Sequence, residues 1–205
     1  IIFYGPPGTG KTTLLKLIQG MIPVDEGSAV TGSHVEIGYY DQEHQQLHME
    51  KTIFDEIADD YPNLNNTKVR NVLAAFLFTD DDVYKRIEDL SGGERGRVAL
   101  AKLMLSDANF LILDEHTAAL DPKTAAKVLT LTDKIIKENN LTAMMVTHNM
   151  RDAIAHGNRL IMMHEGKVIL NIAGEEKKKL TVADLLQQFE RVSGEEFTSD
   201  KELLS

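Results

Sequence analysis

The chain has 205 residues, of which 42% are hydrophobic and 26% charged, the balance of one globular domain with a buried core. No run approaches the roughly 20 apolar residues of a membrane-spanning helix, and the first residues lack the pattern of a signal peptide, so we expect a soluble, cytoplasmic domain. Without cysteine there are no disulfides, thiolate metal sites or cysteine nucleophiles, and the net charge of −10 opposes generic binding to DNA or anionic lipid.

Strand-like and helix-like segments alternate along the chain, which predicts an α/β fold with a mainly parallel sheet flanked by helices. A short buried strand over 1–4 enters a glycine-rich turn. The apolar spacing from Leu14 to Ile22 then predicts a helix, closed by Gly20 and Pro23. Alternating residues over 35–39 predict a half-exposed strand.

The middle of the chain has a helical pattern. Thr52 is expected to cap one helix, and apolar residues at helical spacing from Val69 to Leu77 predict another. A further helix follows Gly93. We therefore predict a helical subdomain over approximately 43–105, inserted into a single domain that spans 1–205.

Strands and helices alternate again in the second half. The run 110–113 has the length and apolar character of a central parallel strand. Asp121 and Pro122 form a good N-cap and first position for a helix that stops at Asn139 and Asn140. The methionines in the strands are interpreted as core residues; they are Met144, Met145, Met162 and Met163.

The C-terminal part predicts a hairpin and one more helix. A strand over 143–146 comes first, and 160–163 and 168–172 then read as a hairpin around a Glu-Gly turn. Thr181 opens the last clear helix with a sequence that resembles a capping box. Residues 193–205 are predicted to be a loose tail.

One charged run lies between the hairpin and the last helix. It covers 175–179, and its opposite charges largely cancel. We therefore predict a solvated turn there and not a binding patch.

The strongest signal for function is a phosphate-binding loop. The run from Gly5 to Thr12 fits the pattern G-x-x-x-x-G-K-[ST] and stands between a predicted strand and a predicted helix, as the mechanism requires. Backbone N–H groups and the helix N-terminus would hold the phosphates, Lys11 would reach the β- and γ-phosphates, and the Thr12 hydroxyl would bind Mg²⁺. The predicted ATP-binding residues are Gly5, Pro6, Gly8, Thr9, Gly10, Lys11, Thr12 and Thr13.

An acidic pair follows the predicted central strand. Asp114 is expected to bind Mg²⁺ directly or through water, and Glu115 to act as the general base. An Asp-Glu pair at a strand end also occurs as a helix cap or a surface pair. The phosphate loop on the same chain favours the catalytic interpretation.

A second glycine-rich segment precedes a long helix and forms another arrangement suited to anions, although the same pattern fits an ordinary capped helix start. Its residues are Ser91, Gly92, Gly93 and Glu94. With the phosphate loop and the acidic pair, these residues resemble an ATP-binding cassette, and the resemblance covers essentially the whole chain. It implies a P-loop NTPase fold in which the Ser91 loop of one subunit closes over the nucleotide on the Gly5 loop of another, with two ATP held in a dimer.

The resemblance assigns further residues. Gln42 is similar to the glutamine that contacts Mg²⁺ and the attacking water, and His148 to the histidine that contacts the γ-phosphate. Leu120 and Asp121 resemble the loop that crosses the dimer interface. His116 stands where the family often has proline and receives no catalytic role.

The sequence departs from the family pattern at its start. Family members have an N-terminal antiparallel subdomain with an aromatic residue that stacks on adenine, whereas here the loop begins at the fifth residue. We therefore expect this subdomain to be missing. Tyr4 is too close to the loop to replace the stacking residue.

The two halves resemble different branches of the family. Residues 38–43 and the run from 53 to 97 resemble the F-subfamily translation factors, whereas residues from 116 to the tail resemble ATP-binding subunits of bacterial importers. The phosphate loop alone is also similar to that of AAA+ ATPases, in which the segment 90–94 has no counterpart.

The leading interpretation is a Mg²⁺-dependent ATPase subunit of a transporter. Its expected partners are a second cassette, identical or a close paralogue, a membrane-spanning permease and a substrate-binding lipoprotein. It would be cytoplasmic and held at the inner face of the membrane through that permease. The alternatives are a ribosome-associated translation factor and an incomplete fragment that binds ATP without turnover.

Overall fold

The structure is a computed structural model that describes residues 1–40 and 47–193. The predicted residue Gln42, the start of the predicted helical subdomain at 43 and the predicted tail beyond Ser193 lie outside these residues. The chain divides into two compact units. The first comprises Ile1–Ile37, Ile112–Glu115 and the described part of Ala143–Ser205, and the second comprises Gly38–Leu111 and His116–Thr142.

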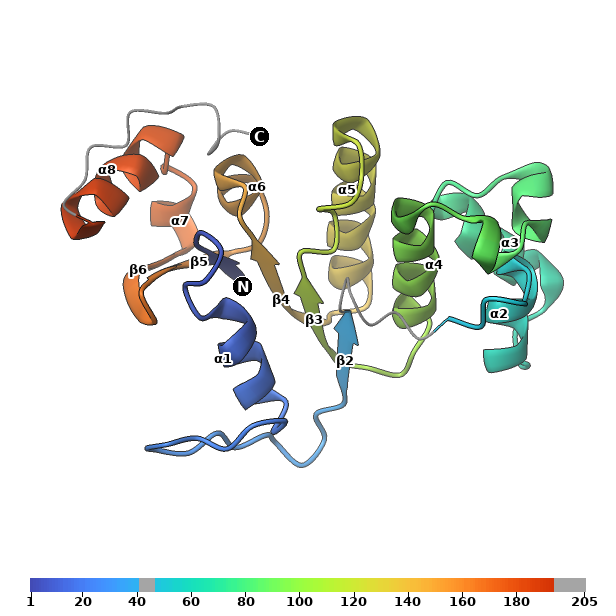
Figure 1. The fold of residues 1–205 in the computed structure, drawn as a ribbon, viewed down its shortest axis with the longest axis horizontal. Helices are drawn as coiled ribbons and strands as arrows, with labels where there is room; N and C mark the ends of the chain where they lie inside the picture. The colour runs from blue at the N-terminus through green and yellow to red at the C-terminus, as the bar shows by residue number, and fades with distance from the viewer. Residues whose placement is uncertain (41–46, 194–205) are drawn as a thin grey trace. The chain divides into compact units, whose positions relative to one another are not determined.

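Helices and strands alternate as the sequence predicts (Figure 1). The strands are β1 (Ile2–Tyr4), β2 (Ile37–Tyr40), β3 (Phe110–Asp114), β4 (Thr142–Thr147), β5 (Arg159–His164) and β6 (Lys167–Ala173). The α-helices are α1 (Lys11–Ile18), α2 (Ile53–Asp60), α3 (Asn66–Ala75), α4 (Gly92–Met104), α5 (Pro122–Glu138), α6 (Met150–Ala155), α7 (Gly174–Lys177) and α8 (Val182–Ser193). Two 3₁₀ helices are η1 (Asp80–Tyr84) and η2 (Ile87–Asp89).

The described strands form one six-stranded sheet in the order β2-β3-β4-β1-β5-β6. Strand β1 is parallel to β4 and to β5, whereas β5 and β6 pair antiparallel. Tyr4 lies opposite Thr147 of β4, and the Glu115 N–H donates to the Val146 carbonyl at 3.2 Å. The C-terminal ends of β1, β3 and β4 therefore meet at one edge of the sheet, which confirms the predicted fold class.

The predicted core methionines are buried in β4 and β5, which confirms their interpretation. The predicted hairpin also forms, because Glu165 and Gly166 have φ of 47° and 74°, the left-handed values that a two-residue turn between antiparallel strands requires. No described helix is long and apolar enough to cross a membrane.

The predicted extension of the first helix to Ile22 is wrong, because α1 ends at Ile18. Gly20 adopts φ of 70°, the Gly20 N–H donates to the Leu17 carbonyl, and the Met21 N–H donates to the Lys16 carbonyl. This pair of bonds closes a helix with a left-handed glycine. The prediction named Gly20 as one of the closing residues, but the apolar spacing extended the predicted helix past it to Ile22.

The predicted solvated turn at 175–179 is also wrong in part. Residues Gly174–Lys177 form the short helix α7, and Lys177 is only 2% exposed. Its ammonium donates to the carbonyls of Ile154 and His156. Lys178, the next residue, conforms to the prediction because it is exposed and pairs with Glu175.

Helix starts in the second unit follow the predicted caps. Thr52 accepts a hydrogen bond from the Asp55 N–H, and the Asp121 carboxylate accepts from the N–H groups of Lys123 and Thr124. Such caps satisfy backbone donors that a helix leaves unpaired. The boundaries of the helical subdomain, 43–105, stay a prediction.

Candidate nucleotide site

The phosphate loop joins β1 to α1 and has the backbone that phosphate binding requires. Gly10, the residue before α1, has φ of 91°, and α1 begins without a side-chain cap. A side chain at Gly5 would place its Cβ only 2.6 Å from the Met163 carbonyl oxygen, so only glycine fits there. The uncapped N–H groups at the start of α1 form a natural anion site.

Lys11 is drawn into this loop. Its ammonium donates to the carbonyls of Gly5 at 2.5 Å and Pro6 at 2.9 Å, and the residue is only 6% exposed. Burial lowers the pKa of Lys11, while the carboxylates of Glu115 and Asp114 act in the opposite direction. Lys11 thus places a positive charge where the loop backbone would meet a phosphate.

Two of the three residues predicted to bind Mg²⁺, Thr12 and Asp114, lie side by side, and the third, Gln42, lies outside the described residues. The Thr12 hydroxyl donates to Asp114 Oδ2 at 3.4 Å, so α1 and the end of β3 present a hydroxyl and a carboxylate side by side. Mg²⁺ prefers oxygen ligands and is commonly held by one or two protein groups together with substrate phosphates. This hydroxyl and carboxylate therefore suit a metal that arrives with the nucleotide.

The predicted general base and the predicted histidine form an ion pair. Glu115 Oε1 lies 3.5 Å from His148 Nδ1, and both side chains are partly exposed. The hydrogen bond to His148 lowers the pKa of Glu115, and the same bond raises the pKa of His148 against the opposing effect of burial. Glu115 is therefore an ionised carboxylate at neutral pH, as a proton acceptor must be.

The backbone of Glu115 is unusual. Its φ is 47°, a left-handed value that glutamate rarely adopts. Such conformations cost about 1–3 kcal/mol and gather at functional sites. The turn directs Glu115 away from the line of β3 and toward His148.

The ion pair makes stability depend on pH, and replacing His148 with Gln should remove this dependence. The pKa of His148 is raised, so its contribution to stability is complete below about pH 6.5 and is lost as the pH rises through the folded-state pKa. The pKa of Glu115 is lowered, so its contribution is complete above about pH 4.5 and is lost as the pH falls through the folded-state pKa. The free energy of unfolding of His148→Gln should therefore fall furthest below that of the wild-type protein between about pH 4.5 and 6.5, by about 1 kcal/mol or less. Urea unfolding across pH measures this difference, and parallel curves for the two proteins would contradict it.

The predicted signature loop and interface loop lie together in the second unit. A Cβ at Gly93 would stand 2.8 Å from the Ala119 carbonyl oxygen and 3.1 Å from the Leu120 side chain. Asp121 follows as the cap of α5. Both predicted contributions to a dimer interface thus come from one compact region.

The capped helix start that the sequence left open for this segment is present, and its reciprocal form was not predicted. The Ser91 hydroxyl accepts from the Glu94 N–H, while Glu94 Oε2 accepts from the Ser91 N–H at 2.9 Å and from its hydroxyl at 2.7 Å. These bonds lower the pKa of Glu94. The Ser-x-x-Glu spacing is the signal that could have found this capping box.

A second missed residue is electrostatically coupled to His148 of the Glu115–His148 ion pair. Asp152 is in the first turn of α6, a helix that the sequence analysis did not predict. Burial raises its pKa, and the charges of His156 and His148 lower it. Asn149, the N-cap of α6 directly after the strand end, was the available signal.

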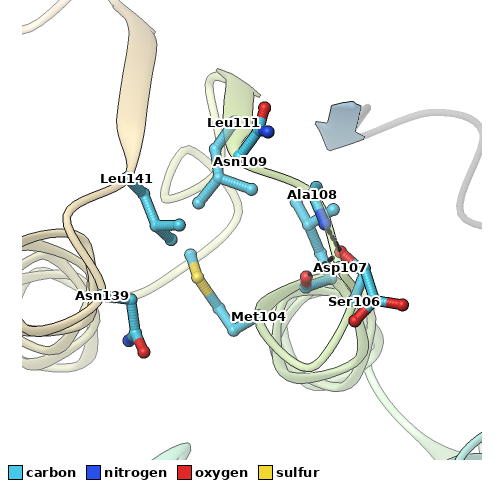
Figure 2. Close-up of a pocket in the computed structure, with 9 residues that line it drawn as sticks. Met104, Ser106, Asp107, Ala108, Asn109, Leu111, Asn139 and Leu141 are labelled. Carbon is cyan, nitrogen blue, oxygen red and sulfur yellow. Dashed lines mark hydrogen bonds between the residues drawn. The ribbon is translucent and has the colours of Figure 1, made fainter. Parts of the chain in front are cut away.

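A cavity in the second unit is separate from all these residues. Its volume is about 210 Å³, and Figure 2 shows Met104, Leu111 and Leu141 pointing toward one another inside it. The lining residues are Leu103, Met104, Ser106, Asp107, Ala108, Asn109, Leu111, Asn139 and Leu141. None of them is a predicted site residue, so the cavity is not the predicted nucleotide site.

Fold and site define a P-loop ATP-binding domain, and known proteins give its family. The family model described as ABC transporter matches residues 1–118. The chain is 35% identical over 211 residues to the tyrosine transport ATP-binding protein of Clostridioides difficile (strain R20291), covering 91% of this chain and 84% of that protein. The chain therefore belongs to the ABC transporter family of ATP-binding proteins.

Similarity also extends to another branch, as the sequence analysis predicted. The chain is 39% identical over 153 residues to the ATP-binding protein Uup of Escherichia coli (strain K12), covering 73% of this chain but only 24% of Uup. A solved dimeric ATP-binding cassette, MJ0796 bound to ADP and phosphate, matches with a TM-score of 0.68 at 22% identity, covering 84% of each chain. At that identity the match establishes the fold.

Proposed function

We propose that this chain is the Mg²⁺-dependent, ATP-hydrolysing subunit of a membrane transporter. The observation that carries the proposal is the meeting of Lys11, Thr12, Asp114, Glu115 and His148 within one compact unit. The similarity to a transport ATP-binding protein over most of both chains supports the role in transport.

Hydrolysis would use these side chains as follows. The loop and Lys11 hold the β- and γ-phosphates of ATP, and Glu115 accepts the proton of a water whose oxygen attacks the γ-phosphorus. The bond from that phosphorus to the bridging oxygen breaks, which leaves ADP and phosphate. His148 holds the Glu115 carboxylate and contacts the γ-phosphate. Thr12, Asp114 and Gln42 would hold Mg²⁺, which would neutralise part of the charge on the phosphates.

Transport requires other chains. A second cassette, identical or paralogous, would supply Ser91, Gly92, Gly93 and Glu94 to each nucleotide, with Leu120 and Asp121 at the interface. The helical region 43–105 would contact a membrane permease and hold the protein at the cytoplasmic face. A substrate-binding lipoprotein fits the importer resemblance of the second half.

The role of Lys11 can be tested with two lysines on the same helix. Lys11→Met should weaken ATP binding by about tenfold to a hundredfold, because a charge-assisted hydrogen bond contributes about 1.5–3 kcal/mol. Lys16→Met, a change at an exposed position of α1, should leave binding unchanged. Isothermal titration with Mg-ATP measures both. Equal affinities of the two variants would overturn the proposed site.

A ribosome-associated translation factor is the second candidate, favoured by the similarity to Uup. It predicts that the protein cosediments with ribosomes when ATP is present and that a permease is not needed. Sedimentation of the purified chain with ribosomes, with and without ATP, separates the two functions. ATP binding without phosphate release by the wild-type chain would contradict both and support a nucleotide-binding fragment.

A further inference from the structure

A buried lysine sits at the end of the helix that follows His148. Lys177 Nζ donates to the carbonyl oxygens of Ile154 at 2.6 Å and His156 at 2.7 Å. Burying an ammonium is costly unless hydrogen bonds compensate, and the C-terminus of a helix is where a positive charge is favoured. Lys177, the last residue of α7, therefore closes the end of α6 from a different segment of the chain.

Helix α6 depends on such closure. It has six residues, too few to be stable without support from outside the helix. At its other end, the Asn149 side chain accepts from the N–H groups of Arg151 and Asp152, and the Asn149 N–H donates to the Thr147 hydroxyl. Hydrogen bonds at both ends thus fix its direction.

His148 stands between the end of β4 and this helix. Its ring nitrogen lies 3.5 Å from Glu115, already at the long end for an ion pair with a hydrogen bond. A small rotation of α6 would carry the His148 backbone with it and open this contact. The position of His148 thus depends on what holds α6.

We propose that Lys177 is a positioning residue for the Glu115–His148 pair, acting through the C-terminal end of α6. Its hydrogen bonds to the carbonyls of Ile154 and His156 hold the end of α6, and its effect on His148 passes along that helix. Its consequence for hydrolysis rests on the proposed function, whereas its effect on His148 does not.

Lys177→Met tests the proposal, with Lys178→Met as the matched control. Methionine has a side chain of similar length but cannot donate the hydrogen bonds to the carbonyls of Ile154 and His156. The variant should lower kcat for ATP hydrolysis by about tenfold to a hundredfold, the effect of a displacement near 1 Å, with the Kd for ATP unchanged. Lys178 is exposed, and its ammonium pairs with the exposed Glu175 carboxylate at 2.6 Å, so its replacement should change neither kcat nor the Kd for ATP. Lys177→Arg, which keeps charge and donors, should restore most of the rate.

NMR of the histidine side chains gives a readout that needs no turnover. In Lys177→Met the pKa of His148 should fall toward the ordinary histidine value, because the contact with Glu115 loosens. If methionine prevents folding, Lys177→Gln, neutral but still a donor, should show the same change in smaller degree. An unchanged pKa of His148 in a folded variant, or an equal change in Lys178→Met, would overturn the proposal. A wild-type chain without ATPase activity would refute the proposed function and leave this test intact.

Discussion

Glu115→Gln should lower the rate of ATP hydrolysis by about 10²–10⁴-fold and leave ATP binding intact, because general base catalysis contributes that much and the amide cannot take the proton. The lowered pKa of Glu115 means that the carboxylate is ionised at neutral pH in the wild-type protein. Phosphate release at saturating Mg-ATP measures the effect. Unchanged turnover would exclude Glu115 as the base.

Glu165→Gln is a close control for this change. Glu165 is an exposed glutamate whose φ of 47° equals that of Glu115. The substitution therefore removes a carboxylate from the same backbone conformation without touching the ion pair with His148. We expect wild-type turnover from this variant.

Blocked hydrolysis should also trap the closed state. With Mg-ATP, light scattering of Glu115→Gln should show a shift from monomer to dimer, because nucleotide that persists keeps two cassettes together. Ser91→Arg added to this variant should abolish the shift, since bulk and charge enter the predicted contact with the partner's nucleotide. Ser91→Ala removes the capping box without adding bulk. Added to Glu115→Gln, it shows how much of the lost dimerisation comes from the missing cap and how much from the bulk and charge of arginine. A monomer at millimolar ATP would contradict the two-site arrangement.

Much of this site is predictable because its chemistry is local in sequence. A glycine-rich turn between a strand and a helix, and acids or a histidine directly after apolar strands, each signal a position on one edge of a parallel sheet. The structure brings Lys11, Asp114, Glu115 and His148 together at that edge. Caps such as Asp121 were equally predictable, since they use neighbouring N–H groups.

What escaped prediction depends on partners that are distant in sequence. Lys177 belongs to a charged run, and such runs are usually solvated, but its ammonium is buried against the carbonyls at the end of α6. The early end of α1 shows a smaller error: Gly20 was predicted as a closing residue, but the apolar residues at helical spacing extended the predicted helix to Ile22. The roles of the site residues, including Gln42, stay predictions.

Lys102→Met should have the largest effect on stability. Glu56 is fully buried, and Oε1 lies 2.6 Å from Lys102 Nζ, while His48 Nδ1 is 3.0 Å from Oε2. Lys102 also pairs with Asp60 at 2.6 Å. Burial alone would lower the pKa of Lys102, but the hydrogen bonds to Asp60 and Glu56 raise it, so the lysine is charged at neutral pH.

Removing this lysine leaves a buried carboxylate without its main partner, which typically costs about 3–5 kcal/mol. Urea unfolding should show a loss of that size for Lys102→Met. Lys51→Met is the surface comparison: Lys51 pairs with an exposed carboxylate, Asp59, at 3.0 Å, and such a pair contributes about 0–1 kcal/mol. Equal losses from the two variants would show that the Glu56 network is not a buried charge pair in solution.

The double variant Glu56→Leu/Lys102→Met distinguishes the net contribution of the ion pair to stability from the loss caused by removing one partner alone. Removing both charges abolishes the desolvation penalty along with the attraction, so the double variant should be markedly more stable than Lys102→Met alone. His48 loses its partner only in the double variant, and its side chain is half exposed, so water can hydrate it at little cost. If the double variant is instead less stable than Lys102→Met, Glu56 contributes through its bonds to His48, and the segment that begins at 47 is held to α2 chiefly by that carboxylate.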